Sequence, residues 1–312
     1  MIQTYTFSKD ENDREIMENM TQEFPVICKT TTSGIVGTFV PWHWHSAFEI
    51  DVVTKGTAMY ETPDRTYTVH AGEALFLNEN VLHRTLFPDK TQENEQFTLL
   101  FFEELLSGAP HSVFARRYVR PVAEDERILG EVIRPADDKG GKSIDTLLRI
   151  RELFRREPYG YELSVRSLLS GIWLELCERL HENEGGERES NPYKNKKIKT
   201  MLELIHTHYS ERLTLERLAA EANISTRECS RAFRENLHVS AMEYVSAYRI
   251  SVAEKQLIET EKSIEDVAAD CGFSSTSYFI KKFRNATAQS PLQFRKENAA
   301  SVRAQAARLS EI

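Results

Sequence analysis

The stretch from Ser263 to Arg295, "SIEDVAADCGFSSTSYFIKKFRNATAQSPLQFR", carries the clearest structural pattern in the chain. Its opening serine, followed by acidic residues and by apolar residues at helical spacing, is typical of the start of a helix. Gly272 then interrupts the pattern, and Ser274 precedes a second helical run that places Phe279 and Phe283 on one face. The stretch therefore predicts two helices joined by a tight turn.

The same pattern occurs earlier in the chain, in "LTLERLAAEANISTRECSRAFRENLHVSAMEYV", where Asn223 takes the place of the turn glycine. The second helix of this copy has Cys229 and Phe233 on its apolar face. A long helix from Ser240 to about Glu259 joins the two copies. The predicted N-caps of the four short helices are Thr214, Ser225, Ser263 and Ser274.

Each second helix carries small polar and basic residues opposite its apolar face. Ser277 and Lys281, for example, are four residues apart and share an exposed face, which is how a helix presents hydrogen-bond donors to the DNA major groove. A solvated face of an ordinary helical bundle is the alternative, and the presence of two copies favours DNA. The predicted DNA-binding residues are Ser225, Arg227, Ser230, Arg231, Arg234, Ser274, Thr276, Ser277, Lys281 and Lys282.

This repeated region resembles the signature of the AraC/XylS family of bacterial transcription regulators. The resemblance covers about Lys197 to Asn298, and Ala288 stands where the family usually has glycine, with His238 at the corresponding place in the first copy. The matching residues are Ile264, Val267, Ala268, Gly272, Phe273, Ser277, Tyr278, Phe279, Phe283, Pro291 and Arg295. The resemblance implies two helix-turn-helix units that read successive major grooves of double-stranded DNA, often beside an N-terminal sensing domain.

A second motif lies near the N-terminus, in "GTFVPWHWHSAFEIDVVTKG". His43 and His45 share one face if this segment is a β-strand, because strand side chains alternate with a period of two, and Glu49 has the same parity if the strand continues without a bulge. His83 is a fourth candidate, after a turn that begins at Gly72 and a short apolar strand. These four residues are candidate ligands of a divalent metal.

The surrounding sequence predicts a sandwich or small barrel of short strands. The predicted strands are 48–54, 57–61, 66–69, 74–77 and 97–102. The spacing G-x5-H-x-H-x3-E-x6-G resembles the first motif of the cupin barrels. The second cupin motif is half present, because Gly72 and His83 match it while Asn78, Asn80 and Phe87 replace its proline, glycine and asparagine.

Three functions compete for the polar residues of this barrel. They could hold a divalent metal for oxygen or isomerase chemistry, they could hydrogen-bond a small-molecule effector, or they could be ordinary buried strand residues. Fusion to a DNA-binding region favours effector binding, because a catalytic domain gains nothing obvious from binding to an operator. The predicted effector-binding residues are His43, His45, Glu49, Tyr60 and His83, with Tyr67 and Phe76 as further inward-facing candidates and with Trp42 and Trp44 on the opposite side of the strand.

The clearest helical pattern outside the repeats is "ELSVRSLLSGIWLELCERL". Its apolar face comprises Val165, Leu168, Leu169, Ile172, Trp173, Leu176 and Leu180. An intrachain core is the first interpretation of this face, and a homodimer interface centred on Leu169, Ile172 and Leu176 is the second. The next segment, "HENEGGERESNPYKNKK", is polar and contains glycine and proline, which is typical of a linker.

Charge divides the chain at this linker. Residues 1–192 carry 21 Lys and Arg against 33 Asp and Glu, a net charge of −12, whereas residues 193–312 carry 19 against 15, a net charge of +4. The basic part is the one that contains the predicted DNA-binding helices. No run approaches the roughly 18 apolar residues of a membrane span, so we expect a cytoplasmic protein. The four scattered cysteines are expected to be reduced core thiols.

We therefore predict an α+β multidomain chain with a cupin-like β-barrel, a helical dimerisation segment and an all-α domain with two helix-turn-helix units. The expected domains are 1–110 for effector sensing, 111–182 for dimerisation, 183–196 as a linker, 197–298 for DNA binding and 299–312 as a tail. The predicted function is transcriptional regulation by a homodimer that responds to a small molecule, for example a carbohydrate. No catalysis and no membrane partner is expected, and a divalent metal is the only cofactor considered.

Overall fold

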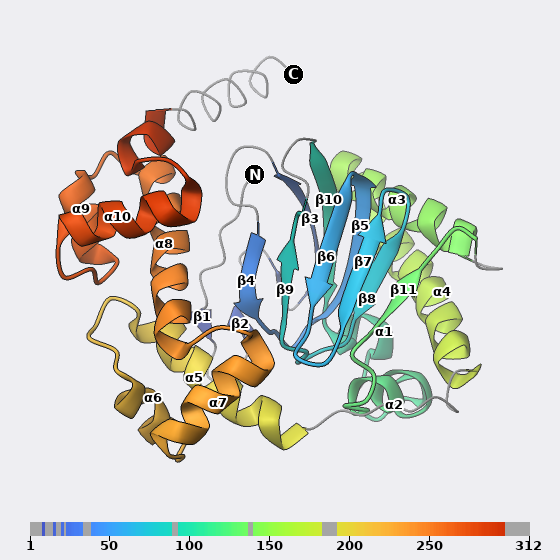
Figure 1. The fold of residues 1–312 in the computed structure, drawn as a ribbon. Helices are drawn as coiled ribbons and strands as arrows, with labels where there is room; N and C mark the ends of the chain where they lie inside the picture. The colour runs from blue at the N-terminus through green and yellow to red at the C-terminus, as the bar shows by residue number, and fades with distance from the viewer. Residues whose placement is uncertain are drawn as a thin grey trace. The chain divides into compact units, whose positions relative to one another are not determined.

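The computed structural model describes residues 8–9, 15–16, 20–21, 23–33, 39–88, 93–136, 140–182 and 192–296. The chain forms two compact units, and the main boundary between them follows Pro192. The first unit is rich in strands and the second is built from helices (Figure 1). Residues 183–191 of the predicted linker and the whole predicted tail, 299–312, lie outside the described residues. All four cysteines are free thiols, as expected.

The strands of the first unit form two sheets that face each other. One sheet has the order β11-β8-β5-β10-β3 and the other has the order β4-β9-β6-β7, and β1 pairs with β2 separately. The strands are β1 (Ser8–Lys9), β2 (Glu15–Ile16), β3 (Val26–Ser33), β4 (Phe39–His43), β5 (Phe48–Lys55), β6 (Thr57–Glu61), β7 (Thr66–His70), β8 (Ala74–Leu77), β9 (His83–Leu86), β10 (Asn94–Phe101) and β11 (Gly130–Ile133). All five predicted strands form, whereas β1, β2, β3, β9 and β11 were not predicted.

Both faces of the five-stranded sheet are buried. Along β5, Phe48 and Ile50 join the core under the helices, whereas Val53 joins a second core between the two sheets. The alternation follows from the two-residue period of a strand. It also explains why β5 is an almost continuous buried segment and not an alternation of apolar and polar residues.

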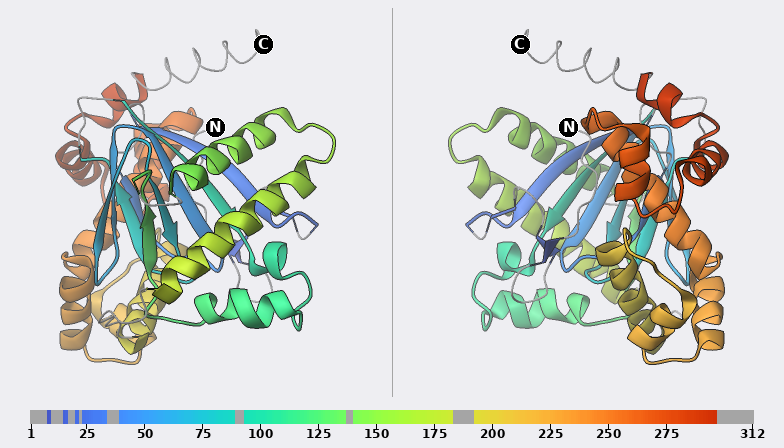
Figure 2. Two further views of the ribbon diagram at one scale, coloured as in Figure 1. Left: turned by 90° about the vertical axis from the view of Figure 1, so that its right-hand side faces the viewer. Right: turned by 90° about the vertical axis from the view of Figure 1, so that its left-hand side faces the viewer.

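The helices of the first unit cover one face of this sheet, with α3 and α4 lying across it (Figure 2). They are α1 (Glu103–Ser107), a π-helical turn η1 (Ala115–Val119), α2 (Arg120–Ala123), α3 (Gly140–Arg156) and α4 (Tyr161–Glu182). The indole of Trp173 on α4 packs on Phe48, with ring centroids 4.7 Å apart, and its Nε1–H donates to the carbonyl oxygen of Tyr118 at 3.1 Å. This helix is therefore fixed to the sheet by both packing and hydrogen bonding.

The apolar face of α4 belongs to the core of its own chain. Leu169, Ile172 and Leu176 are 1%, 4% and 2% exposed and lie in the same core as β5 and β10. The prediction that these three residues form a dimer interface is therefore wrong, and the intrachain interpretation is correct. The physical reason is that the helix-side face of the five-stranded sheet is apolar and needs an apolar cover, which α4 supplies.

The second unit contains two copies of the predicted helix-turn-helix arrangement. Its helices are α5 (Pro192–His208), α6 (Leu215–Glu221), α7 (Thr226–Leu237), α8 (Ala241–Glu259), α9 (Ile264–Asp270) and α10 (Thr276–Thr287). Asn223 and Gly272 occupy the two turns with positive φ values of 52° and 75°. A side chain at Gly272 would meet the carbonyl oxygen of Ser210 at 2.6 Å, so the close backbone approach requires glycine there.

Three of the four predicted N-caps are correct. The hydroxyl groups of Thr214, Ser225 and Ser263 each accept a hydrogen bond from the backbone N–H three residues later. The cap of α10 is Ser275 and not Ser274, because the second copy has one more residue between its turn and its second helix. Two adjacent serines offer the same capping chemistry, so the sequence alone could not distinguish them.

Two arginines hold the C-terminal ends of α5 and α8. Arg249 on α8 donates from Nε to the carbonyl oxygen of Tyr209, at 2.7 Å, just after α5 ends. Arg295 donates from Nε to the carbonyl oxygen of Leu257, at 3.1 Å, near the end of α8. Each guanidinium satisfies carbonyl groups that a helix end leaves without a partner within the helix.

Candidate functional site

The four predicted ligand residues meet inside the first unit. His43, His45, Glu49 and His83 each offer one ligand atom, and these atoms all lie within 4.8 Å of one another. Their exposed fractions are 2%, 3%, 3% and 1%. We call these residues the barrel cluster. Buried polar groups at this density need partners, so the cluster is a specialised site within a largely apolar core.

The cluster is assembled differently from the sequence prediction. Strand β4 ends at His43, and the chain bends before β5 begins at Phe48, so His45 lies outside both strands. A single continuous strand therefore does not align these residues. They meet because His43 and His83 belong to the four-stranded sheet while Glu49 belongs to the sheet that faces it.

Backbone carbonyl groups fix the orientation of two of the imidazole rings. Nδ1 of His45 lies 2.8 Å from the carbonyl oxygen of Ala47, and Nδ1 of His83 lies 2.8 Å from that of Val81. A carbonyl oxygen only accepts hydrogen bonds, so Nδ1 carries the hydrogen in both rings. The Nε2 atoms face the cluster, and when they carry no proton their lone pairs can bind a cation.

Glu49 lies between these two rings. Its Oε2 is 2.8 Å from Nε2 of His45 and 3.1 Å from Nε2 of His83. Burial of Glu49 opposes ionisation, but the charge of His83 and the hydrogen bonds from both rings outweigh burial and hold the pKa of Glu49 well below its ordinary value. With Nδ1 protonated in both rings, a short contact between Nε2 and this carboxylate requires a shared proton or a bound cation.

A polar chain that the sequence reasoning missed continues from Glu49 along the inner face of the sheets. Tyr60 donates to Oε1 of Gln96 at 2.9 Å, Nε2 of Gln96 lies 3.4 Å from Oδ1 of Asp51, and the hydroxyl of Thr98 donates to the same oxygen. Burial, followed by the charge of Glu49, raises the pKa of Asp51 well above its ordinary value. Asp51 lies two residues after Glu49 on β5, so both side chains point to the same face. This spacing could have identified Asp51 from the sequence.

The remaining inward-facing predictions are partly correct. Tyr60 is fully buried between the sheets, and Tyr67 packs partly buried against the same core. Phe76 faces the other way and packs under the helices, with its ring centroid 5.8 Å from that of Trp173, so its assignment to the inward face is wrong. It follows Leu75 on β8, and adjacent strand residues point to opposite faces.

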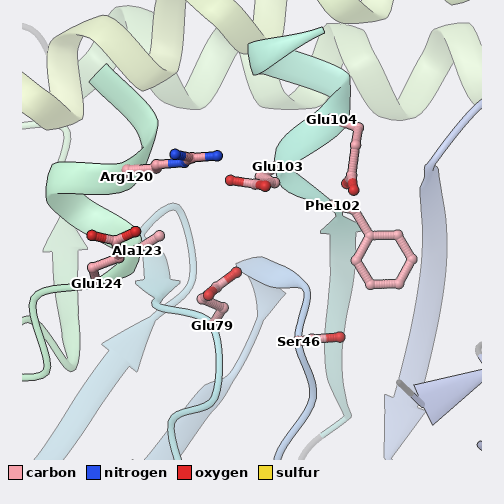
Figure 3. A pocket seen from close by; sticks show the side chains of 8 residues that line it. All are labelled: Ser46, Glu79, Phe102, Glu103, Glu104, Arg120, Ala123 and Glu124. Carbon is pink, nitrogen blue, oxygen red and sulfur yellow. The ribbon is translucent and has the colours of Figure 1, made fainter. Parts of the chain in front are cut away.

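A cavity of about 290 Å³ lies beside the loop that carries His45. Its lining residues are Ser46, Glu79, Phe102, Glu103, Glu104, Arg120, Ala123 and Glu124. The side chains of Glu79, Glu103 and Arg120 extend toward the hollow from a loop and two helices (Figure 3). The N–H of Asn80 donates to the carbonyl oxygen of His45 at 2.7 Å, so the loop that carries Glu79 is tied to the barrel cluster.

The predicted DNA-binding residues lie on α7 and α10 or at their start. Arg227, Arg231 and Arg234 are exposed and follow one stripe of α7, opposite the buried Cys229 and Phe233.

On α10, Ser277 and Lys281 are exposed on the equivalent stripe, whereas Thr276 and Lys282 are half-buried beside it. Arg284 completes the stripe and was missed, although its spacing from Lys281 matches that of Arg234 from Arg231. Ser274 lies in the turn before the helix.

Two sequence families match the chain over these regions. Residues 30–176 match the AraC-like ligand binding domain, and residues 218–297 match a helix-turn-helix domain. The HTH-type transcriptional regulator YdeC of Bacillus subtilis is 31% identical over 298 residues, which cover 94% of this chain and 99% of that protein. The chain therefore belongs to the AraC-type transcriptional regulators, with a ligand-binding domain and a DNA-binding domain.

More distant relatives agree with this assignment. The HTH-type transcriptional activator RhaS of Klebsiella pneumoniae is 22% identical and covers 82% of this chain and 87% of that protein. The crystal structure of ToxT from Vibrio cholerae with a bound unsaturated fatty acid has a TM-score of 0.50 at 12% identity and covers 90% of this chain and 98% of that one, which shows a shared fold. Among the described helices, none is long and apolar enough to span a membrane.

Proposed function

We propose that this regulator binds a divalent transition metal in the barrel cluster and that occupancy of the cluster controls its binding to operator DNA. The observation that carries the proposal is the convergence of His43, His45, Glu49 and His83 on one buried point. Three imidazoles with one carboxylate suit zinc, iron, nickel or manganese better than magnesium or calcium, which prefer oxygen ligands.

The hydrogen bonds around the cluster support a metal. Metal-ligating histidines commonly donate their other ring N–H to a carbonyl or carboxylate, which fixes the ring, and both His45 and His83 do so here. A cation would also stabilise the buried carboxylate of Glu49, which is costly to keep charged in an apolar core. These residues would hold the ion, and no catalytic step is assigned to it.

Strand β5 offers a physical route from the cluster to the helices. Glu49 faces the cluster, while its neighbour Phe48 packs on Trp173 of α4. A change in the position of Glu49 on metal binding would therefore shift the packing of α4. We propose that this packing has two states and that the state it adopts controls binding to operator DNA.

Metal analysis of the untagged protein tests the proposal. We expect about one transition metal per chain by mass spectrometry in the wild type and in a His208→Ala control, and a loss of metal in His45→Ala. Fluorescence anisotropy with operator DNA should then show a changed affinity after chelation in the wild type and in His208→Ala, and no change in His45→Ala. If the wild type contains no metal and takes up none of zinc, iron, nickel or manganese on dialysis, the metal proposal is wrong.

A small-molecule effector is the second candidate, and the cavity beside His45 favours it. The carboxylates and the guanidinium that line this cavity suit a polyhydroxylated or amine-bearing ligand, including a carbohydrate. Thermal denaturation with a panel of sugars and amines is the test. We expect a stabilising ligand whose effect is lost in Arg120→Leu or Glu103→Leu. If no ligand in the panel raises the melting temperature, or if the effect survives both substitutions, this candidate is not supported.

We also propose that the regulator acts as a homodimer, because two protomers can occupy two half-sites and so double the specific contacts with DNA. The interface must lie elsewhere than on the buried face of α4. Sedimentation equilibrium of the whole chain, with and without DNA, measures the mass, and a monomer under both conditions would contradict the proposal.

A further inference from the structure

We infer that the two reading helices recognise different bases: α7 selects guanine and α10 selects thymine. The inference rests on the DNA-binding function that family membership shows, and it is independent of the metal and effector proposals.

The two helices can be compared residue by residue. Each has 12 residues, and the buried pairs Cys229 with Phe233 and Phe279 with Phe283 occupy the same places in each. Each exposed residue of α7 therefore has an equivalent 50 positions later in α10. The outward stripe of Arg227, Arg231 and Arg234 corresponds to Ser277, Lys281 and Arg284.

The stripe of α7 presents three guanidinium groups in line. An arginine donates two parallel hydrogen bonds to O6 and N7 of guanine, which no other base pair accepts in the same geometry. Arg227 and Arg231, nearest the start of the helix, are in the part of a recognition helix that contacts base edges. The carboxylate of Glu228 accepts hydrogen bonds from the N–H and the hydroxyl of Ser225, at 3.0 and 2.9 Å, so it is held at the helix end.

The equivalent face of α10 begins with a shorter side chain and contains more apolar residues. Ser277 replaces the first arginine, and Tyr278 and Ile280 stand where α7 has Glu228 and Ser230. Both apolar side chains are unusually exposed, at 47% and 38%. In the major groove, an apolar group such as Ile280 contacts the methyl group of thymine, whereas Lys281 presents a single ammonium that can donate to acceptors of several bases. The chemistry of this face therefore favours thymine.

Selection of binding sites from a randomised duplex library, using the whole chain, tests the inference. We expect a two-part site with a guanine-containing block and a thymine-containing block about one helical turn, or about 10 base pairs, apart. Arg231→Ala should remove the preference in the guanine block alone, and Ile280→Ser should remove it in the thymine block alone. Arg231→Lys keeps the charge but not the two-pronged geometry, so it should also lose guanine preference while retaining most non-specific affinity.

Base analogues in the selected site give a second readout. Replacing guanine by 7-deazaguanine in the first block should weaken wild-type binding at least fivefold, on the basis of about 1–3 kcal/mol for a bidentate contact. Replacing thymine by uracil in the second block removes one methyl group and should weaken binding about fourfold. The 7-deazaguanine substitution should not weaken binding by Arg231→Ala, and the uracil substitution should not weaken binding by Ile280→Ser.

Several results would overturn the inference. Arg231→Ala could leave the selected sequences unchanged while circular dichroism shows the native helix content, or Ile280→Ser could relax the guanine block. Equal affinity for thymine and uracil would exclude the apolar contact. A uniform loss of affinity for all sequences in Arg231→Ala would show that this arginine binds phosphate and does not read a base.

Discussion

His238 and Ala288 occupy equivalent positions directly after the two reading helices, and both have a left-handed backbone, with φ values of 56° and 62°. This conformation ends each helix and allows the chain to turn into the next one. A residue with a Cβ is strained there, whereas glycine is not. His238 and Ala288 therefore allow the fold to form, but each lowers its stability relative to glycine.

Ala288→Gly is predicted to stabilise the second unit by about 1 kcal/mol, because relief of left-handed strain exceeds the added entropy of the unfolded chain. Ala286→Gly, in the exposed last turn of α10, is the matched control and should destabilise by about 0.5–1 kcal/mol. Urea unfolding followed by circular dichroism measures both. Equal effects at the two positions would show that the backbone at Ala288 is not strained.

Ser275→Ala is predicted to destabilise α10 by about 1 kcal/mol, because the hydroxyl of Ser275 accepts the N–H of Tyr278 at 3.3 Å. Ser274→Ala removes the same atoms one residue earlier and should change stability by less than about 0.5 kcal/mol. The comparison of the two unfolding midpoints therefore locates the cap. A larger loss in Ser274→Ala would reverse the assignment.

Lys281→Ala is predicted to lower the ratio of affinities for matched and scrambled operators about tenfold, because this exposed side chain lies on the stripe of α10 that we propose contacts base edges. Lys282→Ala is the control. Its side chain is half-buried, with Nζ 5.6 Å from the ring centroid of Tyr278, so the ratio should change by less than about threefold. Anisotropy titrations at one fixed salt concentration give both ratios. Similar ratios for the two variants would contradict the proposal that Lys281 contacts bases and Lys282 does not.

The stability of the second unit is predicted to fall on acidification because of His206. Burial lowers the pKa of His206 to about 3, and its Nε2 lies 2.8 Å from the hydroxyl of Tyr244. The unfolded chain takes up a proton below about pH 6.5 and the folded chain does not, so stability is lost as the pH falls from about 6.5 toward 3.

The expected loss from this group is about 2 kcal/mol between pH 7 and pH 5. His206→Gln should remove that part of the pH dependence in urea unfolding, whereas His208→Gln, at an exposed histidine, should leave most of it. An unchanged slope in His206→Gln would show that this residue does not control the acid sensitivity.

Leu176→Ala is predicted to destabilise the first unit by about 2–5 kcal/mol, because it leaves a cavity in the core beneath the five-stranded sheet. Leu174→Ala, on the same helix but with a side chain 49% exposed, should cost much less. Thermal and urea unfolding distinguish the two variants. If Leu176→Ala changes the mass in sedimentation while its stability stays the same, the face is an interface after all.

The local patterns of the sequence were enough to predict the helix-turn-helix repeats. Capping residues, turn residues and apolar residues at helical spacing act over a few positions, and Asn223 and Gly272 mark the turns through their own backbone preferences. The same is true of β5 to β8, whose ends coincide with turn residues. The cap at Ser275 was missed because two adjacent serines carry the same signal.

The spacing of His43, His45, Glu49 and His83 identified the barrel cluster, but only the tertiary structure decided how the residues meet. Strand β4 ends at His43, so two facing sheets, and not one strand, bring the side chains together. The inner or outer position of Phe76 and the burial of Leu176 also depend on which face a distant element covers. Sequence periodicity sets which residues share a face. The packing of one element on another, which joins residues far apart in the chain, decides whether that face is core, site or surface.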